Sequence, residues 1–229
     1  MDEPWGVVLF GDVVGSRRVP TDATGWLDAL RRTLDDVYGP DRLADFEFTQ
    51  GDEIQGLLVP AADPFLAVLS SMLHPRTGVG SVPPMRWVTV LGHVDDGRGP
   101  ATHRTGEAFL RARALLGQAR DDRDGLLCQT GDKSADAYLA GTTPMLAAII
   151  EQMTDRQRHI ARLALIDGLR QSEIAARLDV SRPTVSVSYA RADVRNVSRL
   201  LEAIRRIWAD GVARTMAPVD GISAGEVPT

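Results

Sequence analysis

The segment MTDRQRHIARLALIDGLRQSEIAARLDVSRPTVSVSYARA, residues 153–192, has the pattern of three short helices joined by two turns. Thr154 supplies an N-cap for the first helix, and Gly168 ends that helix. After a short second helix, Ser181 caps the third, and Pro183 lies in its first turn, where a missing N–H costs little. The segment therefore predicts a helix-turn-helix unit.

The third helix of this unit is the element expected to contact DNA. Val185 faces inward together with Tyr189 or Ala190, which leaves polar and cationic side chains outside. Such side chains meet base edges and phosphates when a helix lies in the major groove. The predicted DNA-binding residues are Gln171, Ser181, Arg182, Thr184, Ser186, Ser188 and Arg191. The alternative to double-stranded DNA as the partner is a helical bundle that serves dimerisation alone.

The same segment resembles the region-4-like helix-turn-helix shared by sigma factors and many response regulators. The resemblance rests on EIAARLDVSRPTVSVSYARA, residues 173–192, and implies that the chain regulates transcription. Beyond it, an apolar stripe continues at helical spacing from Val194 to Trp208. This stripe predicts a long helix that joins two copies of the chain into a homodimer.

Charge is distributed unevenly along the 229 residues. Residues 1–149 contain 14 Lys and Arg against 21 Asp and Glu, a net charge of −7, whereas residues 150–210 contain 11 Arg against 8 Asp and Glu, a net charge of +3. Arginine favours bidentate contacts with phosphate and guanine, so the basic part fits a DNA partner. A modest excess of arginine also fits helices whose cations are simply solvated.

Cysteine content and hydropathy indicate a cytoplasmic protein. The single cysteine, Cys128, excludes an internal disulfide. No apolar run approaches the ~18 residues that a membrane span requires. The start, Met-Asp-Glu-Pro, lacks the features of a signal peptide. We therefore expect no membrane association.

Strands and helices alternate in the first of three expected parts, residues 1–141. Strands are expected over 7–10, over 44–59 as a hairpin, over 85–94 and over 126–130, with helices over 22–38, 63–74 and 106–120. The order, βαββαβ followed by αβ, is that of a ferredoxin-like sheet with helices on one face. The predicted fold class is thus α+β, followed by an all-α domain.

This all-α part is the helix-turn-helix domain with its long C-terminal helix, residues 142–210. The stretch from Gly141 to Pro144 marks the expected junction between the two domains. Residues 211–229 are rich in Gly, Pro and Ala and lack periodicity, so they predict a disordered tail.

Two aspartates follow predicted strands in the first domain. Asp12 follows the first strand, and Asp52 lies at the tip of the hairpin; these places are adjacent in a βαββ unit. Two carboxylates there could share Mg²⁺, with phosphate or water completing its shell. The peptide groups and side chains expected to hold phosphates beside the metal are those of Val13, Val14, Gly15, Ser16 and Arg17. The alternative is that both aspartates are ordinary turn residues.

Most of this domain resembles the SatD family. The residues that carry the resemblance are GDVVGSR at 11–17, TQGDEIQGLL at 49–58 and RTGEAFLRARALL at 104–116. More distantly, the domain resembles the palm-like catalytic domain of class III nucleotidyl cyclases. The resemblance implies a ferredoxin-like palm fold and a purine nucleotide as the ligand.

The cyclase resemblance also implies roles for individual residues. Asp12 and Asp52 stand at the positions of the metal ligands, and Arg111 and Arg113 remain as phosphate ligands. Leu110, however, stands where the cyclases carry the Asn that holds the ribose. Without that anchor the 3′-hydroxyl is not aimed, so we expect nucleotide binding without efficient cyclisation and assign no catalytic residue.

The sequence therefore predicts a ligand-responsive DNA-binding regulator. Nucleotide binding would favour one arrangement of the dimer and thereby change its affinity for DNA. The alternatives are a nucleotidyl cyclase or other nucleotidyl-transfer enzyme with an attached DNA-binding module, and a nucleotide-binding adaptor whose C-terminal helices bind another protein.

Overall fold

The computed structural model describes residues 3–15, 24–49, 52–77 and 82–218. Its centre is a five-stranded sheet with the strand order β2-β3-β1-β4-β5. The strands are β1 (Trp5–Val13), β2 (Arg42–Phe48), β3 (Glu53–Leu58), β4 (Met85–His93) and β5 (Leu126–Gln129). β1 pairs antiparallel with β3 and β4, and β5 joins β4 in parallel. The order β2-β3-β1-β4 confirms the ferredoxin-like α+β class, to which β5 is an addition.

Eight α-helices occur in the described residues. They are α1 (Thr24–Tyr38), α2 (Phe65–Met72), α3 (Glu107–Asp122), α4 (Lys133–Glu151), α5 (Asp155–Leu165), α6 (Gln171–Arg177), α7 (Arg182–Arg191) and α8 (Val194–Met216). Two 3₁₀ turns, η3 (Gly39–Asp41) and η4 (Ala101–His103), precede β2 and α3. The helices predicted over 22–38, 63–74 and 106–120 are confirmed as α1, α2 and α3, with bounds that differ by at most two residues.

Alternation along β1 assigns its side chains to two cores, because successive residues of a strand point to opposite faces. Val7 and Leu9 belong to the core that α1 and α2 cover, whereas Val8 and Phe10 pack beneath α3. The expectation that all helices lie on one face was therefore wrong. The added α3-β5 unit covers the second face, and buried residues such as Phe109 seal it.

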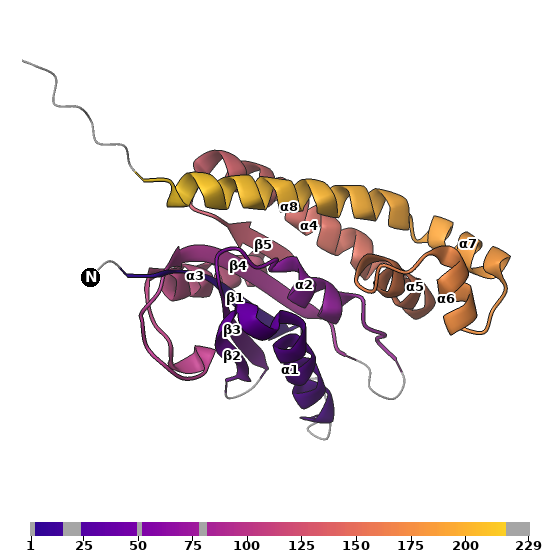
Figure 1. Cartoon of the computed structure of the whole chain (residues 1–229), viewed down its shortest axis with the longest axis horizontal. Coiled ribbons are helices and arrows are strands. Elements are labelled where there is room, and N and C mark those ends of the chain that lie inside the picture. The colour runs from indigo at the N-terminus through magenta and orange to yellow at the C-terminus, as the bar shows by residue number, and fades with distance from the viewer. Residues whose placement is uncertain (1–2, 16–23, 50–51, 78–81, 219–229) are drawn as a thin grey trace, which may run out of the picture.

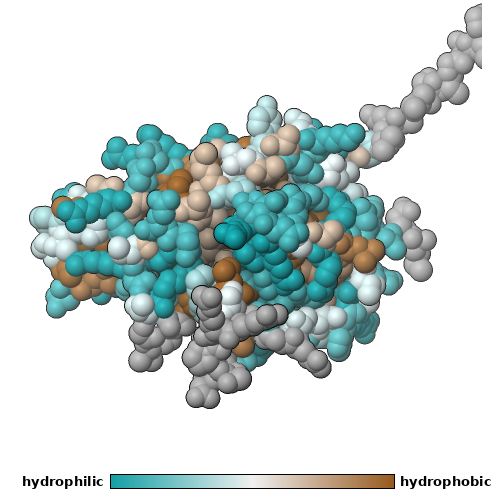
Figure 2. Space-filling view, turned by 180° about the vertical axis from the view of Figure 1, so that it is seen from behind, coloured by the Kyte–Doolittle hydropathy of each residue, from teal (hydrophilic) through white to brown (hydrophobic). Residues whose placement is uncertain are grey.

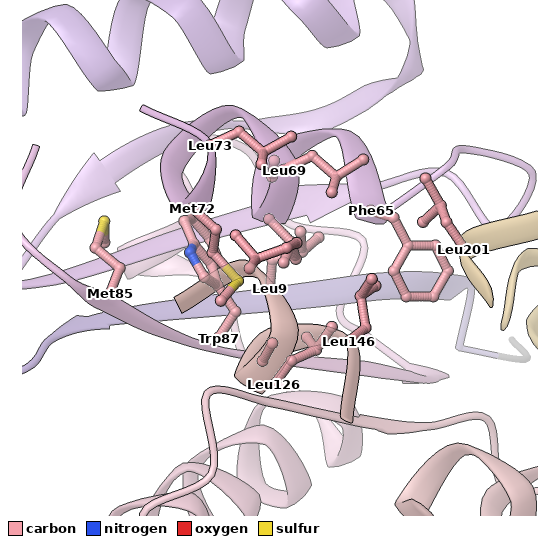
Figure 3. Packing of buried hydrophobic residues seen from close by; sticks show 14 of the residues in the cluster. Leu9, Phe65, Leu69, Met72, Leu73, Met85, Trp87, Leu126, Leu146 and Leu201 are labelled. Atoms are coloured by element: carbon pink, nitrogen blue, oxygen red, sulfur yellow. The ribbon is translucent and has the colours of Figure 1, made fainter. Parts of the chain in front are cut away.

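Two of the helices that follow the sheet, α4 and α8, pack against it instead of standing apart. Leu146 of α4 and Leu201 of α8 share one core with Leu9, Phe65 and Trp87 (Figure 3). α8 runs alongside α4 above the sheet (Figure 1). Its apolar stripe, which we expected to join two copies, is thus buried within the chain.

Two predicted boundaries also need correction. α4 continues through the stretch expected to be a junction and holds Pro144 inside the helix. The Thr143 hydroxyl lies 2.8 Å from the carbonyl oxygen of Leu139 and 3.0 Å from that of Leu126, which ties this turn to the sheet. The disordered tail expected from Gly211 does not begin there, because α8 extends to Met216 and Gly211 is buried. Residues 219–229 lie outside the described part.

Hydrophilic residues cover most of the surface seen from behind, and hydrophobic residues form small patches between them (Figure 2). This distribution agrees with the burial of the large apolar side chains in the cores. Among the described residues, no helix is both long and apolar enough to cross a membrane.

Candidate functional site

The helix-turn-helix unit has a small core of its own. Ile160 and Leu163 of α5, Ile174 and Ala175 of α6, and Val185 of α7 are buried together. Asp179, in the turn between α6 and α7, has a φ of 50°, in the left-handed region that Asp tolerates better than most residues. This core fixes the angle between α6 and α7 and leaves the other side of α7 free.

Side-chain caps start two of these helices. The Gln157 N–H donates to the Thr154 hydroxyl, and the Thr154 N–H donates to the Gln157 side chain, which together form a capping box at α5. At α7, the Ser181 hydroxyl accepts from the Thr184 N–H and lies 2.8 Å from the Thr184 hydroxyl. Ser181 and Thr184 therefore serve first to begin the helix that carries the other predicted DNA contacts.

The exposed face of α7 contains only some of the predicted residues. Arg182, Ser186 and Arg191 are exposed, whereas Thr184 and Ser188 are half-buried at the flank, as is Gln171 at the start of α6. Tyr189 packs into the core. Sequence reasoning missed three exposed residues of this face, which are Pro183, Val187 and Ala190. The 3.6-residue period places them beside Ser186, so spacing alone could have found them.

The arginines around α7 have no carboxylate partner in the part of the chain that the structure describes. Within the described residues, no ion pair involves Arg177 of α6, Arg182 or Arg191 of α7, or Arg195 and Arg199 of α8, and all five are exposed. Cations that have no internal partner remain available to phosphates. The α7 face thus combines free guanidinium groups with short polar and apolar side chains, which is the composition of a surface that reads DNA.

A second concentration of charge lies beneath α3. Asp12 of β1 faces Glu53 on β3 and Arg86 on β4 in the strand register, and all three are buried. Arg86 Nη1 lies 3.2 Å from Asp12 Oδ2, and Arg120 of α3 binds both oxygens of the same carboxylate, at 3.0 and 2.7 Å. This hydrogen bonding to Asp12 raises the pKa of Arg120.

Glu53 is bound in a similar way. Arg113 Nη1 lies 3.1 Å from Glu53 Oε1, and the Gln55 amide donates to the same oxygen at 2.9 Å. The Arg113 guanidinium also lies 5.0 Å from the centre of the Phe10 ring. Sequence reasoning missed Glu53, Arg86 and Arg120; the one available signal was a cation, Arg86, inside an otherwise apolar strand.

The donor set around Asp12 does not fit a resident Mg²⁺. Both oxygens of the Asp12 carboxylate accept from arginine, and the side chain of Asp52 forms no hydrogen bond or ion pair in the described part of the chain. The residues described include no group of three His, Cys, Asp or Glu side chains that could hold a metal ion. A hard cation would have to compete with two guanidinium groups, so the expected pairing of Asp12 with Asp52 is not formed.

The segment expected to bind phosphate, residues 13–17, directs its first peptide N–H groups to carbonyl oxygens of the protein. The Val13 N–H donates to the Asp52 carbonyl oxygen at 3.2 Å, and the Val14 N–H donates to that of Pro84 at 2.8 Å. Asp12 and Val13 belong to β1, which extends further than the sequence indicated, so these peptide groups serve the sheet. Gly15 has a φ of 73°, and the remaining two residues of the prediction, Ser16 and Arg17, lie outside the described residues.

The two arginines predicted to bind phosphate point to different sides of α3. Arg113 reaches Glu53, whereas Arg111 donates to the carbonyl oxygen of Leu91 at 3.2 Å and lies near Gln129 of β5. Between them, Leu110 is 75% exposed. Of these two arginines, only Arg113 lines a pocket of about 650 Å³. The pocket is also lined by Phe10, Gln55, Leu110 and the first turn of α3.

Residues 144–192 match the family described as sigma-70, region 4. The match covers the second half of α4 and the whole of α5, α6 and α7, which are the elements that form and support the exposed α7 face. It confirms the helix-turn-helix and indicates DNA binding. The matched residues are a minor part of the chain.

Comparisons of the whole chain with solved structures and curated proteins give less information about function. Two solved structures of bacterial light-regulated adenylyl cyclases are similar to it. The first has 16% identity and a TM-score of 0.43 over 60% of this chain and 81% of the other; the second has 15% identity and a TM-score of 0.40 over 55% and 43%. At these values the similarity says nothing about the chemistry of this chain. No curated protein matches its sequence.

A polar junction connects the sheet domain to the region-4-like helices. Arg76, after α2, donates through its backbone N–H to Asp155 at 2.8 Å and through its side chain to Glu151 at 2.9 Å. The Thr77 hydroxyl and N–H donate to Asp155 as well. Arg158 of α5, which is buried, donates to the carbonyl oxygens of Glu151 and Met153 at 2.7 Å each. The start of α5 is therefore held by the sheet domain.

Proposed function

We propose that the chain is a transcription regulator that binds double-stranded DNA through the exposed face of α7. The observation that carries the proposal is the pair of free, exposed arginines at the two ends of this face, Arg182 and Arg191. The side chains between them are small or apolar, so a DNA backbone and base edges can approach closely. The region-4 match over the same helices supports it.

Substitution of the two arginines tests this proposal. Arg182→Ala and Arg191→Ala should each weaken binding by about 1 to 3 kcal/mol if the side chain contacts a base. Duplexes selected by the parent protein from a random library supply the ligand, and fluorescence anisotropy gives the Kd. Arg206→Ala, an exposed arginine of α8, is the matched control and should bind as the parent does. Equal affinity of all three variants would show that α7 is not the reading helix.

The sheet domain is proposed to bind a purine nucleotide, and this binding is proposed to change the affinity for DNA. Its site would be the pocket that Arg113 and Phe10 line. α3 begins at Glu107 without a side-chain cap, and the N–H groups of Phe109 and Leu110 donate to the Gly106 carbonyl oxygen. Those of Glu107 and Ala108 form no hydrogen bond among the described residues and are the groups that an anion would meet. The arginine and these N–H groups suit phosphates, and the rings of Phe10 and Phe109 suit a flat base.

Calorimetric titration with ATP and GTP tests this second step. Arg113→Ala should abolish binding, whereas Arg111→Ala should leave it unchanged, because the Arg111 guanidinium is bound on the opposite side of α3. Since Asp12 is held by arginines, we expect the same affinity with and without Mg²⁺. Binding that requires Mg²⁺ and is lost in Asp12→Ala would contradict this expectation.

Nucleotidyl cyclase activity is the alternative. The exposed Leu110 offers no group for a ribose, and the Asp12 carboxylate is committed to Arg86 and Arg120, so the described residues favour binding over cyclisation. Release of pyrophosphate from ATP or GTP, lost in Asp12→Ala, would reverse this ranking.

Homodimerisation also stays a prediction. Tyr138 and Met145 of α4 are exposed apolar side chains that a second copy could cover, and sedimentation of Tyr138→Asp against the parent tests it.

A further inference from the structure

A second pocket, of about 690 Å³, lies between the sheet domain and α4, away from the pocket beside Arg113. One wall is α4, which contributes Pro144, Ala147, Ala148 and Glu151, together with Gln152, the residue that caps its C-terminus. The opposite wall comes from the ends of β1 and β4 and from the turn between α3 and β5. A volume of this size is within the range of small-molecule sites.

The inner part of this pocket is apolar. Met72 of α2 and Met85 of β4 are buried side chains that line it and belong to the core shown in Figure 3. Methionine adapts its shape to irregular ligands. Across from them, α4 contributes Pro144, Ala147 and Ala148 as well as Glu151, and the small side chains of the first three leave the space open.

The rim of the pocket carries three arginines, of which one is free. Arg86 and Arg120 are paired with Asp12, but the exposed Arg123 has no ion pair within the described residues. Its φ of 62° is that of a left-handed helix C-cap, and its backbone N–H donates to the carbonyl oxygen of Ala119 at the end of α3. Among the acidic residues of the rim, Glu151 is paired with Arg76 and Arg158. Arg123 is therefore the cation of the rim that has no carboxylate partner among the described residues.

The pocket touches the part of the chain that carries the DNA-binding helices. Glu151, the last residue of α4, lines the pocket and holds Arg76 and Arg158. Arg158 in turn belongs to α5, whose buried side chains position α6 and α7. At the other end of the contact, α4 approaches the sheet so closely that a Cβ on Gly125 would lie 2.8 Å from the Ala147 Cβ. A ligand between the two walls would therefore displace or fix α4.

We propose that this pocket is an effector site for an amphipathic organic anion, an aromatic or branched body bearing a carboxylate, sulfonate or phosphate. The body lies between Met72, Met85 and the alanines of α4, and the anionic group binds Arg123. Occupancy changes the position of α4 and, through Glu151 and Arg158, the presentation of α7. The binding step is independent of the proposed function, whereas the effect on α7 rests on it.

The fluorescent anion 1-anilinonaphthalene-8-sulfonate is the probe for the binding step, used with the full chain. The parent should bind it at one site; Arg123→Ala should weaken binding about tenfold or more, as loss of a charge-assisted contact does. Ala148→Trp should abolish binding by filling the pocket. The matched controls are Arg206→Ala, Ala137→Trp on the exposed face of α4, and Arg113→Ala in the other pocket, all of which should bind as the parent does. Circular dichroism melting establishes that each variant is folded.

Two outcomes would overturn the proposal. Equal probe binding by folded Ala148→Trp and the parent, or loss of binding in Arg113→Ala alone, would place the anion elsewhere. In the second arm, DNA affinity is measured with and without the probe, and we expect a shift in the parent that is absent in Ala148→Trp. Probe binding without any shift would overturn the regulatory role. If the parent bound no DNA at all, the proposed function would fail while the fluorescence arm still decided the site.

Discussion

Two groups of arginines in this chain have the same chemistry and opposite uses. Beneath α3, Arg86 and Arg120 are tied to the buried carboxylate of Asp12, and Arg113 to that of Glu53. Around α7, Arg182 and Arg191 are exposed and bind no carboxylate of the described residues. The comparison teaches that a guanidinium group held by a buried carboxylate serves the fold first, whereas one without a partner among the described residues remains available to a ligand. Arg113, which is paired with Glu53 and also lines a pocket, is the one group proposed to do both.

The largest expected effect comes from breaking the buried group. Asp12→Ala leaves the cation of Arg86 buried without its partner, which should cost about 3 kcal/mol of unfolding free energy. Urea denaturation measures this loss. The double variant Asp12→Leu/Arg86→Met removes both charges. Its loss of unfolding free energy should be smaller than the summed losses of the single variants Asp12→Leu and Arg86→Met. If Asp12→Ala were as stable as the parent, the cluster would not be a structural ion pair, and a ligand role for Asp12 would regain support.

The second prediction concerns the exposed arginines of α7. The double variant Arg182→Ala/Arg191→Ala should change the unfolding free energy by less than about 0.5 kcal/mol, because both side chains are exposed and unpaired. Its DNA affinity should depend less steeply on salt, with the slope of log K against log salt smaller by about one for each lost phosphate contact. Anisotropy at several salt concentrations measures the slope. An unchanged slope combined with a loss of stability would mean that these arginines are structural after all.

Secondary structure was largely predictable because its signals are local. Apolar spacing located every helix of the unit around α7, and the chemistry of Thr154 and Ser181 located two helix starts. The first part of α4 was not predicted, because Gly141 and Pro144 indicate a loop. In the structure, burial of Thr143 and Leu146 against the sheet outweighs that local preference.

The buried charges were not predictable for a related reason. Gly11-Asp12 has the pattern of a strand end, yet β1 continues through Asp12, because cations on β4 and α3 satisfy that carboxylate. Arg120 is 108 residues away from Asp12 in the chain, and no short motif records such a pairing. The α7 face was found in part because its residues are neighbours on one helix.

A smaller effect separates the folding of α7 from its contact with DNA. Ser181→Ala removes the cap that accepts from the Thr184 N–H and should destabilise the chain by about 1 kcal/mol. Thermal melting measures this cost, and Ser186→Ala, on the exposed face, should leave the melting temperature unchanged. If Ser181→Ala lowered DNA affinity without any loss of stability, the hydroxyl would be a direct DNA contact, as the sequence had suggested.

The smallest expected effect lies at the junction between the two groups. Hydrogen bonds from the Thr77 hydroxyl and then from the Arg76 backbone N–H lower the pKa of Asp155 from its ordinary value of 3.8. Because the folded pKa is the lower one, the stabilisation is fully present above the unfolded pKa and is lost as the pH falls through the folded one. Asp155→Asn should therefore melt at a lower temperature than the parent at neutral pH and lose less stability on acidification below about pH 4. Melting temperatures across this range decide it, with Asp167→Asn, an exposed carboxylate of the same unit, as the control. If the melting temperatures of Asp155→Asn and the parent changed equally with pH, the sheet domain would not hold α5 through this carboxylate. The route from the α4 pocket to α7 would then depend on Glu151 and Arg158 alone.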